Sequence, residues 1–186
     1  MCNDAKMCVE VKAGTYIYMV ILLFLIPLKW ILAWLLAAGF HEVCHWLAVK
    51  ACGGEIYSLT IGLGGARMEC GPLSDKRRLI VVLSGPFGGM ILLLFAQWLP
   101  RTALCSWLLS IYNLFPLLSL DGGRALEILL GSKAIVIQKI FLLMLSIVAV
   151  YLTVILRFGL FPIAIIALLW VKSRNTPCKL RACKVQ

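Results

Sequence analysis

Long apolar runs dominate the chain, and charged residues, prolines or glycines bound each of them. The first run extends from Thr15 to about Lys50, and Pro27 interrupts it near the middle. One helix of that length would be about 54 Å long at 1.5 Å per residue, far more than the roughly 30 Å of a hydrocarbon core. The run therefore predicts two membrane-spanning helices, over about 15–28 and 30–50, joined by a tight turn.

The segment Cys52–Arg78 has a different pattern and is rich in glycine. Apolar residues alternate with polar or small ones from Tyr57 to Leu63, and a period of two indicates a strand. The run Gly62–Gly65 allows a turn, after which Ala66–Glu69 returns. We expect a small β-hairpin here, lying at the membrane surface between the second and third spans.

Four further apolar runs follow the hairpin, and the last of them is short. They predict spans at about 79–99, 103–121, 134–156 and 158–171. The fold class is therefore an all-α polytopic membrane protein with about six transmembrane helices and a small membrane-surface β-hairpin. The whole of 1–186 is expected to form a single membrane-embedded domain.

Composition supports a membrane protein. The chain is 62% hydrophobic and only 14% charged, with a mean hydropathy of +0.99. Soluble domains are roughly half apolar and about a quarter charged, so a water-soluble domain, a disordered chain and a disulfide scaffold are all excluded. The eight cysteines form no C-x-x-C pair, and we expect them to be reduced thiols.

The net charge of +10 comes from basic residues that lie mainly between and after the apolar runs. That distribution orients a membrane protein and does not suit nucleic-acid binding. With both termini cytosolic, fifteen basic residues lie inside and three, Lys29, Arg101 and Arg157, lie outside. This bias predicts a multi-pass protein of the cell membrane whose basic tail, 172–186, lies on anionic lipid in the cytosol. A five-span alternative, with 134–171 as one span, would put the tail outside.

The second predicted span contains H-E-x-x-H, formed by His41, Glu42 and His45. The chain has no other histidines. Positions i and i+4 share one face of a helix, so both imidazoles can bind one zinc ion. Glu42 lies beside them, placed to take a proton from the water that zinc activates. A pair of core histidines is the alternative, but an ionisable residue inside a span costs at least ~2.5–3.5 kcal/mol and is usually functional.

Two histidines leave a catalytic zinc site incomplete, because such sites generally have three protein ligands and a water. Asp121 and Glu127 are the acidic candidates within later apolar sequence. The alternative for Asp121 is an interfacial cap paired with Arg124, but beside H-E-x-x-H we favour ligation. Cys44 could also be a ligand, but it precedes His45 by one residue, points about 100° away and is expected to pack.

A second motif follows the histidines. N-x-x-P-x-x-x-x-D-G runs from Asn113 to Gly122, and together with H-E-x-x-H in a transmembrane helix it resembles the site-2 protease family of intramembrane zinc metalloproteases. The resemblance implies that Asp121 is the third zinc ligand and that Asn113 and Pro116 help to hold the substrate. It covers about Leu32–Leu130, within a catalytic core of about 30–130.

Two glycine motifs extend the resemblance. Leu63-Gly64-Gly65 resembles the glycine turn of the family's hairpin, and Ser84-Gly85-Pro86 resembles its small-Gly-Pro motif. Gly85 and Gly89 also form G-x-x-x-G, which predicts close helix packing within the bundle, with a dimer face as the alternative. The compact plan and Asp121-Gly122-Gly123-Arg124 look most like the stage IV sporulation membrane protease group.

The resemblance implies a zinc-dependent intramembrane metalloendopeptidase with one Zn²⁺ per chain. Its substrate would be a membrane-embedded or membrane-associated regulatory protein, and the sporulation group implies a transcription-factor precursor. We expect membrane lipid and this protein substrate as partners, and no nucleic acid, while regulatory membrane proteins and a second copy of the chain stay open. The competing functions are a catalytically silent membrane scaffold with a structural metal site and a metal transporter.

Overall fold

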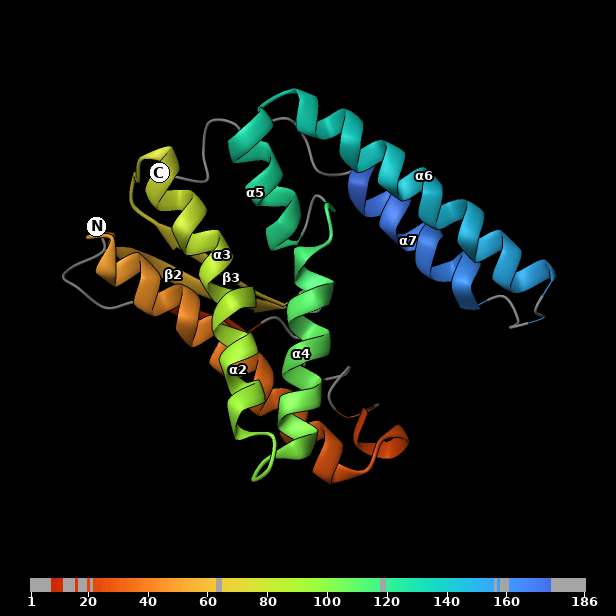
Figure 1. Ribbon diagram of the computed structural model, residues 1–186, viewed down its shortest axis with the longest axis horizontal. Coiled ribbons are helices and arrows are strands. Elements are labelled where there is room, and N and C mark those ends of the chain that lie inside the picture. Colours follow the sequence, from red (N-terminus) through yellow and green to blue (C-terminus); the bar gives the residue numbers. More distant parts are fainter. Residues whose placement is uncertain are drawn as a thin grey trace. The chain divides into compact units, whose positions relative to one another are not determined.

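A computed structural model of the chain describes residues 8–11, 16, 20, 22–62, 65–117, 120–155, 157 and 161–174. This part of the chain is mostly helical and carries one small sheet (Figure 1). The helices gather into two units, of which the first runs to Leu114 and the second begins at Phe115. The single membrane-embedded domain expected over 1–186 stays a prediction.

Three helices of the described residues are long and apolar enough to cross a membrane. They are α2 (Leu28–Ala51), α3 (Asp75–Ile91) with its 3-10 continuation η1 (Leu92–Phe95), and α6 (Lys133–Val154). These helices match the spans predicted at 30–50, 79–99 and 134–156. The chain is thus a membrane protein, as its composition indicated.

The spans predicted at 15–28 and 158–171 are not confirmed as membrane-spanning helices. The span over 15–28 lies partly outside the described residues. The span over 158–171 corresponds to α7 (Phe161–Arg174), which has 14 residues. An α-helix of that length is about 21 Å long, less than a hydrocarbon core of roughly 30 Å. The expected count of about six spans therefore stays a prediction.

The predicted span over 103–121 is wrong at its end. Helix α4 (Pro100–Leu114) stops before Pro116, and Asp121 begins a separate helix, α5 (Asp121–Leu130). Proline has no N–H to donate and disfavours helical backbone at the residue before it, which accounts for the end of α4. The candidate third ligand therefore lies at the start of a helix, where the sequence pattern had placed it at the end of one.

The predicted β-hairpin is confirmed. Strand β2 (Ile56–Gly62) pairs antiparallel with β3 (Gly65–Cys70), and Gly62 lies opposite Gly65. The two central residues of the expected turn lie outside the described residues. Alternating side chains and glycines at the turn were sufficient signals, because a hairpin is built from neighbouring residues.

A third strand joins the hairpin. β1 (Cys8–Val11) pairs in parallel with β2, so the strand order is β1-β2-β3. The sequence pattern did not predict it, because four residues carry too short an alternation and the partner lies about fifty residues later. Among the described strands, β3 is left at one edge of the sheet and β1 at the other.

In the first unit, α2, α3 and α4 pack against one another (Figure 1). The Ser106 hydroxyl of α4 donates to the carbonyl of Gly89 on α3, with 2.7 Å between the oxygens. A Cβ added at Gly89 would lie only 2.5 Å from the Ser110 hydroxyl, so glycine permits this approach. The G-x-x-x-G prediction of close packing within the bundle is thereby supported for its second glycine.

In the second unit, α6 and α7 lie side by side (Figure 1). The indole Nε1 of Trp170 on α7 donates to the hydroxyl of Ser146 on α6 across 3.0 Å. Leucines from the segment before α5 pack on α6 in a small buried cluster, formed by Leu117, Leu120 and Leu142. Helix α6 thus contacts both α7 and the chain that leads into α5.

Candidate metal centre

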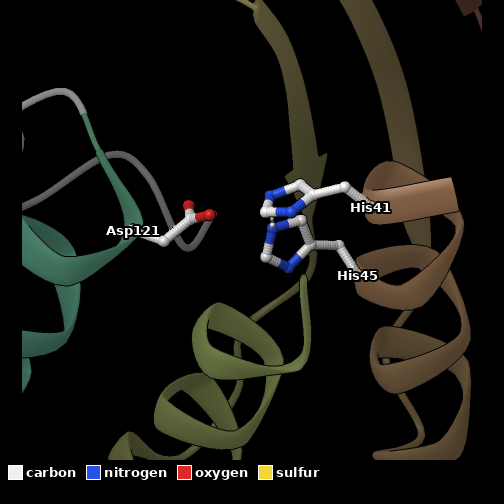
Figure 2. A group of neighbouring side chains, drawn as sticks. All are labelled: His41, His45 and Asp121. Carbon is white, nitrogen blue, oxygen red and sulfur yellow. Dashed lines mark hydrogen bonds between the residues drawn. The ribbon is translucent and has the colours of Figure 1, made fainter. Parts of the chain in front are cut away.

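The two histidines project from successive turns of α2, on one side of the helix (Figure 2). Residues four apart share a helix face, so the sequence spacing alone brings the rings together. Their centroids are 4.8 Å apart and the ring planes are nearly perpendicular. His41 is only 4% exposed. The His41 ring is therefore held within the protein, and the His45 ring is half-buried beside it.

The Nε2 atoms of His41 and His45 face each other at 3.2 Å. Two nitrogens bound to one tetrahedral zinc at about 2.0–2.1 Å would lie roughly 3.3–3.4 Å apart. The observed separation therefore fits two ligands of one ion. The geometry of the two histidines alone is therefore compatible with binding one zinc ion.

The other ring nitrogen of His45 is held by α3. Nδ1 lies 2.7 Å from the backbone carbonyl oxygen of Val81. A carbonyl can only accept, so Nδ1 donates to it, and in the neutral ring Nε2 then keeps its lone pair. This is the tautomer that a metal ligand needs, and a hydrogen bond to the remote nitrogen commonly orients such ligands.

Ser84 supports the same carbonyl. Its hydroxyl oxygen lies 2.7 Å from the Val81 carbonyl oxygen and 3.2 Å from that of Cys44 on α2. It also lies 3.4 Å from Nδ1 of His45. One serine therefore connects the two helices at the level of the imidazole.

Gly85 leaves the space that the histidine rings use. A Cβ added there would lie 2.5 Å from Cε1 of His45 and 2.7 Å from Nε2 of His41, closer than real Cβ contacts. Only glycine lets α3 approach the two histidine rings this closely. The first glycine of G-x-x-x-G thus leaves room for the two histidine rings, while Gly89 lets α3 approach α4.

Cys44 faces α3 as well. A Cβ at Gly88 would lie 2.8 Å from the Cβ of Cys44 and would also overlap its sulfur. The thiol thus lies against a glycine of the neighbouring helix, in agreement with the packing role expected of it. Glu42, the candidate base, is half-buried and directly follows His41 in α2.

Asp121, also drawn in Figure 2, is the first residue of α5 in the second unit and is 6% exposed. The positive end of a helix dipole favours the ionised carboxylate there. The pairing with Arg124 is present, with 3.5 Å between Nη1 and Oδ1. A carboxylate has about four lone-pair sites, so this ion pair is compatible with ligation.

The two candidate substrate residues lie at the end of α4 and just beyond it. Asn113 is half-buried and donates from Nδ2 to the carbonyl oxygen of Leu109, 3.0 Å away. Pro116 is half-buried in the segment between α4 and α5. Glu127, the other acidic candidate, is half-buried on α5, six residues after Asp121.

Sequence reasoning missed the role of Val81 and the contacts of Ser84. A backbone carbonyl carries no signal in the sequence, since every residue has one. Ser84 carries a signal in the sequence only as part of Ser84-Gly85-Pro86, which resembles a family motif. His45 and Val81 are thirty-six positions apart in the chain, so no local spacing rule reveals this pairing.

Similarity to known proteins is found at the level of three-dimensional structure. No protein-family model matches the chain, and no curated protein matches it. Among solved structures it is similar to one described as "Site-2 Protease from Methanocaldococcus jannaschii". The TM-score is 0.66 at 17% sequence identity, over 100% of this chain and 94% of that chain. The chain therefore has the fold of a solved site-2 protease.

Proposed function

We propose that the protein is a zinc-dependent intramembrane metalloprotease of the site-2 type. The observation that carries this proposal is the histidine pair, with its two Nε2 atoms 3.2 Å apart on a helix able to cross a membrane. Similarity of fold to a site-2 protease supports the class. The H-E-x-x-H motif adds a carboxylate beside the two ligands, which a structural metal site does not need.

The proposed ligands are His41 and His45 of α2 and Asp121 at the start of α5, side chains of the types that bind zinc. Two imidazoles and one carboxylate suit zinc, and three protein ligands leave one position for substrate or water. We expect one Zn²⁺ per chain. When bound, the ion supplies Lewis-acid chemistry toward water and the peptide carbonyl.

Glu42 is the proposed general base. Its carboxylate takes a proton from the attacking water and then delivers a proton to the leaving amide nitrogen. The Val81 carbonyl keeps the His45 ring in the orientation and tautomer needed. Asn113 is proposed to hydrogen-bond the substrate backbone and Pro116 to shape the chain beside it.

A helical substrate hides its carbonyls in hydrogen bonds to the residue four positions later, so it must unwind locally before cleavage. Strand β3 lies at an edge of the sheet and can accept an extended segment by strand addition. The proposed substrate is a membrane-embedded or membrane-associated regulatory protein. The resemblance to the sporulation group makes a transcription-factor precursor the first substrate to test.

The proposed setting is the cell membrane, with several spans and both termini in the cytosol. The fifteen-to-three split of basic residues supports this orientation. Anionic lipid at the cytosolic face is the proposed partner of the basic tail. Water and released products would then exchange with the cytosol.

The test compares wild type with Glu42→Gln, co-expressed with candidate membrane substrates in a heterologous host. Gln is nearly isosteric but cannot accept the proton, so cleavage should fall at least ~10²-fold while zinc stays bound. Glu55→Gln, an exposed glutamate just after α2, is the matched control and should cleave normally. Wild-type cleavage by Glu42→Gln would refute the mechanism. Zinc binding by both proteins without any cleavage across a substrate panel would favour the scaffold.

A further inference from the structure

The residues that follow the candidate third ligand have a low intrinsic propensity to form a helix. Asp121 is followed by Gly122 and Gly123 in the first turn of α5. Glycine has more backbone freedom than any other residue and is a poor helix former. Local sequence therefore does not hold the Asp121 carboxylate in one place, and tertiary contacts must do so.

Helix α6 supplies such a contact from a polar side chain. Gln138 is 5% exposed, and its Nε2 donates to the carbonyl oxygen of Gly123 across 3.0 Å. Its Oε1 is buried and has no hydrogen-bond partner among the residues that the structure describes. A buried amide with one atom unsatisfied costs stability, so folding alone does not explain it.

A second contact comes from the same face of α6. Leu142, four residues after Gln138, packs in the buried cluster with Leu120, the residue before Asp121. Residues four apart share a helix face. Helix α6 therefore contacts the chain on both sides of Asp121. The contact before Asp121 is apolar, and the contact after it is a hydrogen bond.

We propose that Gln138 is a positioning residue, which fixes the first turn of α5 so that Asp121 presents its carboxylate to the metal. The inference rests on the proposed function, in which Asp121 is a zinc ligand. Gln138 does not touch the ion in this proposal. Its effect passes through the Gly123 carbonyl to the two glycines that connect this carbonyl to Asp121.

The test measures zinc affinity of purified full-length protein in detergent, by competition with a chelator of known affinity. Gln138→Met keeps the length of the side chain but removes the donor and the buried acceptor together. Zinc affinity should fall about tenfold, the low end for residues that orient metal ligands. The midpoint of thermal unfolding of the zinc-free protein should stay unchanged or rise, because an unsatisfied acceptor is lost.

Ser146→Ala is the matched control. Ser146 is also a polar residue of α6, but it accepts from Trp170 of α7 and donates to Leu142 of its own helix. Its loss should leave zinc affinity unchanged even where it lowers the unfolding midpoint. Backbone hydrogen exchange in the zinc-free protein adds a local readout. The first turn of α5 should exchange faster in Gln138→Met and at the wild-type rate in Ser146→Ala.

Asp121→Ala separates the inference from the proposed function. If it loses zinc while Gln138→Met binds zinc like wild type, the positioning role is wrong and the ligand assignment stands. If Asp121→Ala binds zinc like wild type, the ligand assignment fails and the inference with it. Gln138→Leu, which suits a membrane helix, repeats the measurement should the Met variant not accumulate. Wild-type zinc affinity and exchange in Gln138→Leu would overturn the inference equally.

Discussion

Nδ1 of His45 donates to the backbone carbonyl of Val81, 2.7 Å away, and this bond decides which ring nitrogen faces its neighbour His41. The bond crosses from α2 to α3. The hydroxyl of Ser84 lies 2.7 Å from the same carbonyl oxygen. The candidate metal ligand thus depends on a helix that itself supplies no ligand.

Ser84→Ala should weaken zinc binding. The hydroxyl joins the Val81 and Cys44 carbonyls, and without it the His45 ring loses part of its support. We expect zinc affinity to fall about tenfold, as for other residues that orient a ligand. Ser84→Thr keeps the hydroxyl and should recover part of the affinity. Ser106→Ala, which removes a similar bond between α3 and α4, should bind zinc normally, and equal losses in both variants would contradict the prediction.

Gly85→Ala should disrupt the histidine pair. The added methyl would meet Cε1 of His45 at 2.5 Å and Nε2 of His41 at 2.7 Å, so the rings or α3 must move. Zinc affinity should fall by at least about tenfold, while the protein stays folded. Gly39→Ala on α2 is the control, because nothing lies within 4 Å of its added Cβ. It should bind zinc normally and gain about 0.5–1 kcal/mol of stability. Normal zinc binding by Gly85→Ala would show that the rings sit elsewhere.

Metal analysis should find one zinc per chain in detergent, since the proposed ligand set is single. His45→Ala and Asp121→Ala should each lower the zinc content markedly, because either change leaves two protein ligands. Cys44→Ala should retain zinc, since its sulfur packs against Gly88. A full zinc content in Asp121→Ala would exclude this residue as the third ligand, and loss of zinc in Cys44→Ala would add the thiol to the candidates.

Reporter fusions at Met1 and Gln186 should both report the cytosol. The expectation rests on the positive-inside rule, with Lys29, Arg101 and Arg157 as the external basic residues. Activity of a periplasmic or extracellular reporter at Gln186 would support the five-span alternative. A fusion between Lys50 and Gly54, after the first helix of the core, should also report the cytosol and serves as the internal reference.

Local sequence was enough for several features of the fold. The length of the apolar runs predicted α2, α3 and α6, because a membrane requires about twenty apolar residues in each span. Alternation and glycines predicted the hairpin of β2 and β3, whose residues are neighbours in the chain. The expected run through 103–121 failed because apolar residues continue past Pro116, whereas helical hydrogen bonding does not.

For the candidate site, the sequence by itself determined the residue types and one spacing. His41 and His45 meet because helical geometry brings residues four apart to one face. Tertiary structure alone decided that the Val81 carbonyl selects the tautomer of His45, that Gly85 leaves room for both rings, and that Gln138 holds Gly123. These contacts depend on backbone carbonyls and on the space that a glycine leaves between helices. Every residue has a backbone carbonyl, so the sequence does not mark which one forms a contact, and the packing of the helices decides it.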